Sequence, residues 1–242
     1  MIAGFIITGN TPKKVVARGI GPSLGNFGIT NFLVDPFLEL RGSNGALIRS
    51  NDNWKDNQRG EIEGGPFQPS DDRESVIVAT LTPGQYTALL TGVGGTTGVG
   101  LVELYDGNIA ATSELGQIST RGFVQTGGNV MIAGFSLGGS GNSAWIAVRG
   151  LGPSLSDAGL SNVLADPTLE LHNSNGTTLV ANDDWQDDPV SAAWLTANGL
   201  ALPDPKESGI FTSLPSPEQF TAILAGKNGG IGVGLVEIYN LR

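Results

Sequence analysis

The sequence has no cysteine and a single histidine, His172. The lack of cysteine excludes disulfide bonds and thiolate metal sites, and one histidine cannot build a histidine-rich zinc or iron site. No apolar run reaches the roughly 20 residues that a membrane-spanning helix needs. The lack of disulfides is still compatible with secretion, because a domain of ordinary size can bury enough core to fold without them.

Positive charge is also scarce. Thirteen basic residues stand against 23 acidic ones, for a net charge of −10, and 37 residues are glycine. An acidic protein has no electrostatic attraction to nucleic acid or to an anionic membrane surface. We therefore expect no nucleic-acid partner and no membrane insertion. Weak charge and abundant glycine favour a soluble protein of the extracellular space or the cell surface.

The chain is built from two copies of one unit. MIAGF occurs at Met1 and again at Met131, and the spacing between matched segments grows along the unit. Small insertions of this kind belong in loops. The sequence predicts a first repeat over residues 1–115 and a second over 116–242. Other matched segments are RGIGPSL at 18–24 and RGLGPSL at 149–155, SNDNW at 50–54 and ANDDW at 181–185, and GVGLVELYD at 98–106 and GVGLVEIYN at 232–240.

We expect no signal peptide at the amino terminus, because Met1 to Phe5 repeat a segment that is internal in the second copy. We expect the chain to be a fragment or a processed form of a longer protein.

Hydrophobic periodicity predicts strands almost throughout. Short apolar or alternating runs are separated by Gly, Pro, Asn and Asp, and Asn-Gly at 44–45 and 175–176 predicts two hairpins. Seven or eight strands per unit favour an all-β fold of two tandem antiparallel β-sandwich domains of jelly-roll type. One short helix is expected between Asp188 and Gly199, with Asp188 as its cap and Pro189 in its first turn.

The segment between the repeats predicts an additional strand. Residues 106–130 contain QISTRGFVQTGGNV, a strand and turn with no counterpart ahead of Met1. The first unit is therefore expected to lack one strand of the second. Either the sheet tolerates this loss, or another chain or copy completes the exposed edge by strand addition. The second reading makes other protein chains, or copies of itself, the expected partners.

Candidate catalytic motifs are weak. Gly134 to Gly138 match G-x-S-x-G, and Asp166 and His172 follow in the order of a hydrolase triad. In the first copy Ile6 replaces Ser136 and Arg41 replaces His172, and the context is strand rather than strand, turn and helix. The glycine-rich segment 92–98 precedes a strand and not a helix, which favours a flexible hairpin loop over a phosphate-binding loop.

Two acidic positions recur in both copies, as Glu39 and Glu170 and as Glu103 and Glu237. They are expected to point outward or to pair with Arg18 and Arg149 rather than to catalyse glycoside hydrolysis. We thus expect no catalytic residue, no organic cofactor and no enzymatic activity.

The Asn-Asp loops are the strongest candidate for chemistry. They place oxygen donors at alternating positions, the arrangement that a hard cation such as Ca²⁺ requires. Asp and Asn also form turns without a metal, so a purely local role stays open. Trp54 and Trp185 in these loops are expected to be buried, with sugar stacking as the alternative. The predicted calcium ligands are Asp52, Asn53 and Asp56 in the first unit and Asp183, Asp184 and Asp187 in the second; Asp71, Asp72 and Asp204 are additional candidates.

These segments carry a resemblance. RGIGPSL, DPFLEL, SNDNW, SDDRES, LTPGQYTALLTG and TTGVGLVELYD together resemble a tandem β-sandwich repeat of secreted and surface proteins of environmental bacteria. The latter half of each unit also resembles the bacterial pre-peptidase C-terminal domain. The second copy departs from the pattern at residues 203–207 and 215–217. The resemblance implies an accessory, non-catalytic extracellular module, some relatives of which bind calcium or matrix polymers.

Two functions follow as hypotheses. The first is a structural or adhesive surface module that assembles into filaments by strand addition. The second is a carbohydrate- or matrix-binding module stabilised by calcium, which would be distinguished by exposed coplanar aromatic side chains.

Overall fold

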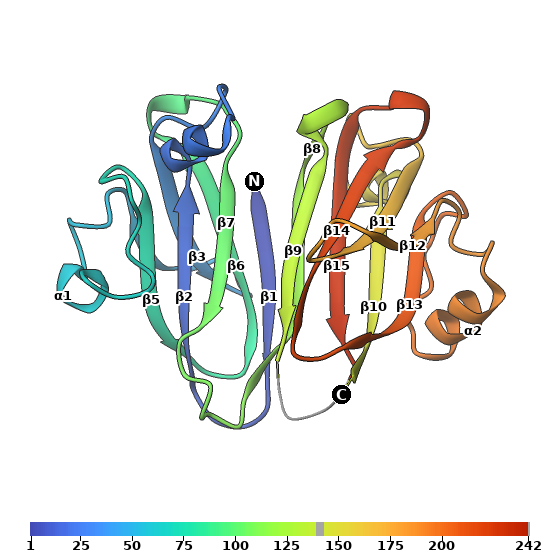
Figure 1. Ribbon diagram of the computed structural model, residues 1–242, viewed down its shortest axis with the longest axis horizontal. Coiled ribbons are helices and arrows are strands. Elements are labelled where there is room, and N and C mark those ends of the chain that lie inside the picture. The colour runs from blue at the N-terminus through green and yellow to red at the C-terminus, as the bar shows by residue number, and fades with distance from the viewer. Residues whose placement is uncertain (139–142, 242) are drawn as a thin grey trace. The chain divides into compact units, whose positions relative to one another are not determined.

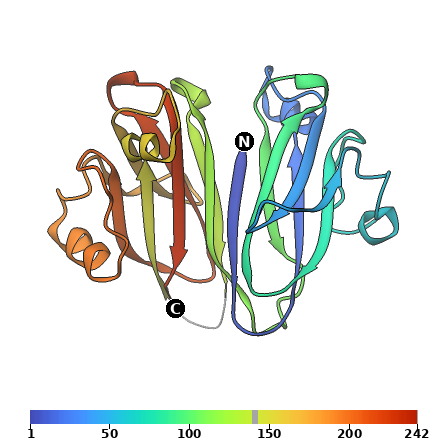
Figure 2. The ribbon, with the colours of Figure 1, turned by 180° about the vertical axis from the view of Figure 1, so that it is seen from behind.

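The computed structural model describes residues 1–138 and 143–241. It divides the chain into two compact units, Met1–Gly116 and Gln117–Arg242. Each unit consists of two antiparallel β-sheets with short helices in the connections, as the views from the front (Figure 1) and from behind (Figure 2) show. The predicted all-β sandwich class is confirmed.

Unit 2 is a complete jelly roll. One sheet has the order β12-β11-β14-β9 and the other has the order β13-β10-β15-β8. The first strand of the unit thus lies beside the last, and the second beside the seventh, as in a jelly roll. The strands are β8 (Glu114–Val124), β9 (Met131–Leu137), β10 (Ser143–Leu151), β11 (Pro167–Asn173), β12 (Thr178–Asn182), β13 (Ser208–Pro215), β14 (Glu218–Gly226) and β15 (Gly232–Asn240).

Unit 1 repeats this arrangement with one strand fewer among the described residues. Its sheets have the orders β1-β6-β3-β4 and β5-β2-β7, and the counterpart of β8 is missing. As a result β7 is an edge strand, whereas its counterpart β15 lies between two strands. The strands are β1 (Ile2–Thr8), β2 (Lys13–Ile20), β3 (Pro36–Gly42), β4 (Leu47–Asn51), β5 (Ser75–Leu81), β6 (Gly84–Gly92) and β7 (Leu101–Asp106).

Each core forms where the apolar positions of the two sheets meet. Residues of β1 alternate between buried and half-buried, as expected for a strand with one face on the core. Leu38 and Leu90 are at most 2% exposed in unit 1, and Leu169 and Leu224 are as buried in unit 2. Burying such a side chain contributes about 1.5–3 kcal/mol each.

One repeated glycine is required by close backbone approach. A Cβ atom at Gly21 would lie 2.0 Å from the carbonyl oxygen of Leu33, and one at Gly152 would lie 2.1 Å from that of Leu164. Both glycines precede a 3-10 helix, at Pro22–Phe27 and Pro153–Ala158. The repeated G-P-S-L motif is therefore a packing feature of the fold.

The predicted hairpins and helix are confirmed. Gly45 and Gly176 adopt positive φ between paired strands, as an Asn-Gly turn requires. The helix α2 (Pro189–Ala197) begins after Asp188, whose side chain accepts the backbone N–H of Val190. A shorter helix, α1 (Arg59–Ile62), occupies the same connection in unit 1.

The expectation of a hairpin at residues 92–98 is wrong. The strands on either side, β6 and β7, belong to opposite sheets of unit 1, so the segment crosses between the sheets. It contains a 3-10 helix at Val93–Gly95. Among the described residues, no helix is long and apolar enough to cross a membrane.

Candidate functional site

A fully buried carboxylate organises the R-G-x-G-P-S motif in each unit. Glu74 accepts hydrogen bonds from the backbone N–H of Gly21 (3.2 Å), the backbone N–H of Ser23 (2.8 Å) and the Ser23 hydroxyl (2.7 Å). Glu207 accepts the same three donors from Gly152 and Ser154. Because these bonds satisfy the charge within the fold, both glutamates have a structural role. The sequence did not single them out, since a buried and an exposed glutamate look alike in a polar loop.

The repeated arginines pair with the repeated glutamates of the last strand. Arg18 Nε lies 3.1 Å from a carboxylate oxygen of Glu103, and Arg149 lies 2.9 Å from Glu237. In each unit the two residues are opposite each other on adjacent strands. The expectation that these acids pair with arginine is confirmed. Glu39 and Glu170 contact Arg41 and His172 instead.

The first asparagine of the Asn-Asp-x-Trp loop ties the loop to a strand. Asn51 Oδ1 accepts the N–H of Val76 (2.8 Å), and Asn182 Oδ1 accepts the N–H of Gly209 (2.7 Å). Trp54 and Trp185 are buried, at 1% and 7% exposure, as expected. In both copies the asparagine and the tryptophan attach the loop to the sheet. The side chains of the aspartates between them, Asp52 in unit 1 and Asp183 and Asp184 in unit 2, have no part in this attachment.

Two aspartates of this loop meet a third acidic side chain in unit 2. Carboxylate oxygens of Asp166, Asp183 and Asp184 lie within 4.8 Å of one another. Asp166 comes from the turn ahead of β11, so sequence proximity alone could not add it to the predicted set. Burial raises the pKa of Asp184, and the neighbouring charge of Asp183 raises it further. Lys227 forms an ion pair with Asp183 and so supplies one positive charge to the cluster.

The equivalent positions of unit 1 carry fewer charges. Asp35 and Asp52 correspond to Asp166 and Asp183, and Asn53 replaces Asp184. Lys227 is replaced by Val93, although the backbone N–H of both residues donates to the equivalent aspartate carbonyl. Burial raises the pKa of Asp52, and the charges of Asp35 and Asp56 add to this increase.

One carboxylate oxygen in each of four aspartates is buried without a hydrogen-bond partner. The same atom, Oδ1, is involved in the equivalent positions of both units. Buried carboxylate oxygens ordinarily have a partner, and a hard cation would provide one. These atoms belong to Asp35 and Asp52 in unit 1 and to Asp166 and Asp183 in unit 2.

The remaining predicted ligands have other local contacts. Asn53 Nδ2 donates to Asp56 Oδ2 (3.2 Å), and the backbone N–H of Asp187 donates to the carbonyl of Asp184 (2.9 Å). Asp187 does not belong to the carboxylate group of unit 2.

At the far end of the loop, each additional candidate also has a local contact. Asp71 binds Arg73, Asp72 binds Lys55 and Asp204 accepts the N–H of Lys206. The carboxylates that do come together, those of Asp166, Asp183 and Asp184, are contributed by two separate turns.

The G-x-S-x-G segment does not form a triad. Ser136 lies on β9 opposite Gln219, and His172 lies on β11 opposite Thr221, so the whole of β14 separates them. Two strand spacings amount to about 10 Å. His172 instead contacts Glu170 and the Gly176 carbonyl, and the hydrogen bond to that carbonyl, aided by Glu170, raises its pKa.

Unit 2 also carries a stack of three aromatic rings. Phe211 on β13 lies between Trp145 (ring centroids 4.8 Å apart, 11° between planes) and Trp194 of α2 (4.2 Å, 6°). Trp145 is 51% exposed. Unit 1 places Lys14 and Glu61 at the positions of the two tryptophans, where they form an ion pair. The stack is therefore specific to unit 2.

No protein-family model and no curated protein matches the sequence. The structure has weak similarity to solved ones. A chain of Sulfolobus Turreted Icosahedral Virus is 13% identical over 99% of this chain and 88% of its own length, with a TM-score of 0.30. A protein from Eubacterium rectale described as secreted is 8% identical over 98% and 68%, with a TM-score of 0.23. The subviral particle protein VP2 of infectious bursal disease virus is 11% identical over 98% and 58%, at 0.21.

Proposed function

We propose that this protein is a non-catalytic extracellular module of a bacterial surface or secreted protein, with a structural or adhesive role. Its partners are other protein chains, or copies of itself, joined through a sheet edge into filaments. The resemblance of the repeat implies the non-catalytic, extracellular part of this proposal.

The edge of β7 in unit 1 supports this proposal. Every other strand of unit 1 has the same neighbours within its unit as its counterpart in unit 2, but β7 has one neighbour where β15 has two. An unpaired strand edge presents N–H and C=O groups to an incoming strand. The repeated charged residues do not suggest a different function, because Glu74, Arg18 and Glu103 already have partners within the unit.

Self-association of the purified chain tests the proposal. Size-exclusion chromatography with light scattering over a wide concentration range should show growing oligomers, and electron microscopy should show filaments. Leu101→Lys places a charge on the edge of β7, where Leu101 is 39% exposed, and should abolish association. Leu47→Lys is the matched control on β4, which is an edge strand like its counterpart in unit 2. A chain that stays monomeric at high concentration contradicts the proposal.

A carbohydrate- or matrix-binding module stabilised by Ca²⁺ is the second candidate. The half-exposed ring of Trp145 and the orphaned carboxylate oxygens of both units favour it. Stacked rings cover one another, however, and of the three only Trp145 is as much as half exposed, whereas a sugar platform needs open ring surface. We propose that Asp166, Asp183 and Asp184 would provide the calcium ligands in unit 2, and Asp35 and Asp52 those in unit 1.

A glycan and matrix-protein array, probed with and without chelator, tests this second candidate. Trp145→Ala should remove binding if the ring is the contact, while Trp185→Phe, a buried control, should retain it. Calorimetric titration with Ca²⁺ tests the metal separately, and Asp183→Asn should weaken binding to unit 2. A melting temperature that does not depend on Ca²⁺ would exclude the metal.

A further inference from the structure

The two copies of the last strand differ in burial at matched positions. Val236 and Ile238 of β15 are 0% and 5% exposed, but their counterparts Val102 and Leu104 of β7 are only half-buried. Their sequences are nearly the same, GVGLVELYD against GVGLVEIYN. The pattern of β7 is thus that of an interior strand, although it lies at an edge.

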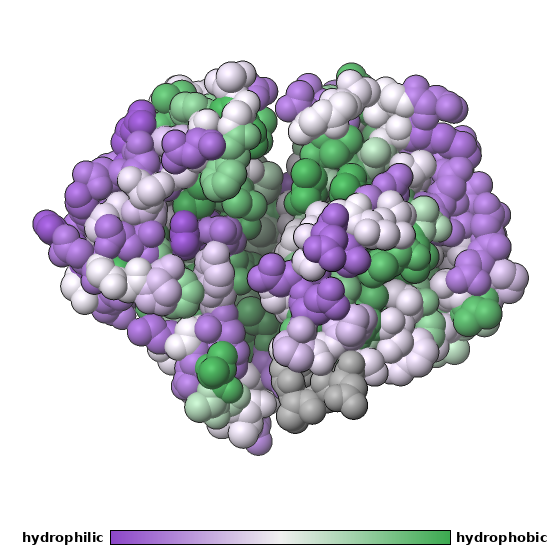
Figure 3. Space-filling view, in the orientation of Figure 1, coloured by the Kyte–Doolittle hydropathy of each residue, from purple (hydrophilic) through white to green (hydrophobic). Residues whose placement is uncertain are grey.

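An apolar surface accompanies this edge. Figure 3 shows apolar side chains exposed over the upper part of β2 and β7 in unit 1, above hydrophilic ones. Leu101 is 39% exposed there.

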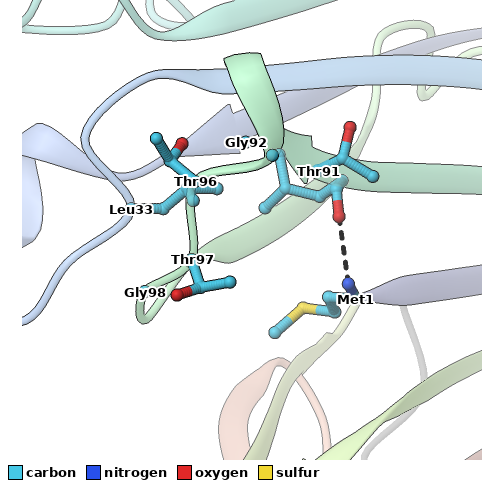
Figure 4. A pocket seen from close by; sticks show the side chains of 10 residues that line it. Met1, Leu33, Thr91, Gly92, Thr96, Thr97 and Gly98 are labelled. Carbon is cyan, nitrogen blue, oxygen red and sulfur yellow. Dashed lines mark hydrogen bonds between the residues drawn. The ribbon is translucent and has the colours of Figure 1, made fainter.

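A cavity of about 360 Å³ opens beside the start of β7. Its apolar lining includes Met1, Leu33 and Leu90, and its other walls include the loop from Thr96 to Gly98 and Gly100. Figure 4 shows Met1 across from that loop. The Met1 amino group donates to the Leu90 carbonyl oxygen at 3.0 Å.

In unit 2 a valine occupies the equivalent space. Val124 of β8 is fully buried in one cluster with Met131, Leu164 and Leu224, the counterparts of Met1, Leu33 and Leu90. Its Cγ2 lies 3.1 Å from the position that a Cβ on Gly234 would take, and Gly234 is the counterpart of Gly100. The cavity of unit 1 therefore corresponds to the place that Val124 fills in unit 2.

The register of β8 on β15 defines what an occupant of unit 1 must look like. Val124 lies opposite Gly232 and Ile118 opposite Ile238, and every second residue between them, Thr120 and Gly122, shares their face. Transferred to β7, this register places a valine opposite Gly98 and an isoleucine opposite Leu104. Bulky side chains at the Gly122 position would meet Met1, because a Cβ on Gly122 lies 3.4 Å from Met131 in unit 2.

We propose that the β7 edge and its cavity form an acceptor site for one extended strand of the β8 type, carried by another copy of the repeat. The strand pairs antiparallel with β7, and its valine enters the cavity between Leu33 and Leu90. The site completes the jelly roll of unit 1 as β8 completes that of unit 2. This inference rests on the proposed function, in that it names the partner of the sheet edge.

A fusion tests the site in cis. A copy of residues 114–130 is added directly ahead of Met1, because these residues directly precede Met131 in unit 2. Amide hydrogen exchange of Leu101–Asp106 should slow at least about tenfold, and the melting transition of unit 1 should rise. The matched control carries Val124→Asp in the added copy only, which places a charge in the cavity and should lose the effect. Equal protection by both fusions overturns the proposal.

A peptide tests the site in trans on the unmodified chain. A fluorescent peptide of residues 114–126 should bind one per chain by anisotropy, and the peptide with Val124→Asp should bind at least about tenfold more weakly. Thr97→Trp in the protein narrows the cavity and should weaken binding to the same degree, whereas Leu47→Lys on β4 should not. If neither Val124→Asp nor Thr97→Trp changes the peptide affinity, the strand pairs with the edge without using the cavity, and the proposal is overturned. The absence of any binding also overturns it.

The two proposals fail in different ways. If the chain stays monomeric but the peptide binds, the acceptor site exists and the filament function fails. If the chain associates but association survives excess peptide and Thr97→Trp, filaments form through another surface and the acceptor site is wrong.

Discussion

At the scale of single side chains, a comparison of the two units distinguishes residues with a structural role from candidates for a functional one. Glu74 and Glu207 recur with the same three hydrogen bonds, and Arg18 and Arg149 recur with the same glutamate partner. A polar residue that makes the same internal bonds in both units is explained by the fold. Ser136 and His172 are not repeated in unit 1, and β14 separates them in unit 2. Neither the repeat nor the geometry supports a catalytic role for them.

Glu74→Ala should destabilise unit 1 because it leaves the N–H groups of Gly21 and Ser23 buried without an acceptor. The expected loss in the free energy of unfolding is about 2–4 kcal/mol, measured by chemical denaturation. Glu63→Ala is the control, since it removes only the exposed ion pair with Arg59 and should have little effect. If Glu74→Ala lowers the free energy of unfolding as little as Glu63→Ala does, the buried hydrogen bonds contribute nothing to stability.

Asp52 should make stability depend on pH even without metal. Its pKa is raised in the folded protein by burial and by Asp35 and Asp56, so folding becomes less favourable as the pH rises from the unfolded pKa through the raised folded value. Asp52→Asn should therefore raise the melting temperature at pH 7 in chelator, and the gain should vanish below about pH 3, where both states are protonated. A loss of stability at pH 7 would show that the carboxylate is favourably paired.

At the scale of elements, the sequence predicted those features of secondary structure that depend on neighbouring residues. The Asn-Gly hairpins and the capped helix α2 depend on neighbouring residues, and both are present. The crossover at residues 92–98 and the addition of Asp166 to the acidic cluster depend on which sheet each strand joins. That choice is made by packing between distant segments, which periodicity does not encode.

The cap of α2 should contribute measurably to its stability. Asp188 accepts the N–H of Val190 and the hydroxyl of Ser191, and the Ser191 hydroxyl bond above all lowers the pKa of Asp188. Asp188→Ala should cost about 1 kcal/mol in chemical denaturation. Because a lowered pKa stabilises the fold only above the unfolded value of about 3.9, the difference should shrink as the pH falls through and below that value. Asp187→Ala, one residue earlier, lacks these two cap hydrogen bonds and should cost less.

The aromatic stack joins α2 to the β10-β13 sheet. Trp194 contributes the contact from the helix, and its ring lies 4.2 Å from that of Phe211. Trp194→Ala should cost about 3–5 kcal/mol of unit 2 stability and release α2, as measured by denaturation and by amide exchange in residues 189–197. The double exchange Trp145→Lys with Trp194→Glu installs the ion pair of unit 1 and should recover part of the loss. No recovery would mean that the ion pair of unit 1 does not substitute for ring packing.

At the scale of the whole molecule, two copies of one fold differ by a single strand, and their stabilities should differ in the same direction. Unit 1 leaves β7 half-exposed and its cavity unfilled by a side chain, whereas unit 2 buries Val236, Ile238 and Val124 completely or nearly so. Each buried aliphatic side chain contributes about 1.5–3 kcal/mol. Unit 1 should therefore unfold at a lower denaturant concentration than unit 2.

The tryptophans make this order measurable. Trp54 is the only tryptophan of unit 1, and Trp145, Trp185 and Trp194 belong to unit 2. Fluorescence thus reports mainly on unit 2, while far-ultraviolet circular dichroism reports on strands of both units. In a denaturant titration the circular dichroism change should begin first, and Trp54→Phe should leave the fluorescence transition almost unchanged. Coincident transitions by both probes would mean that the units unfold together or with equal stability, and the open edge of β7 would then carry no energetic penalty for the strand-acceptor site to relieve.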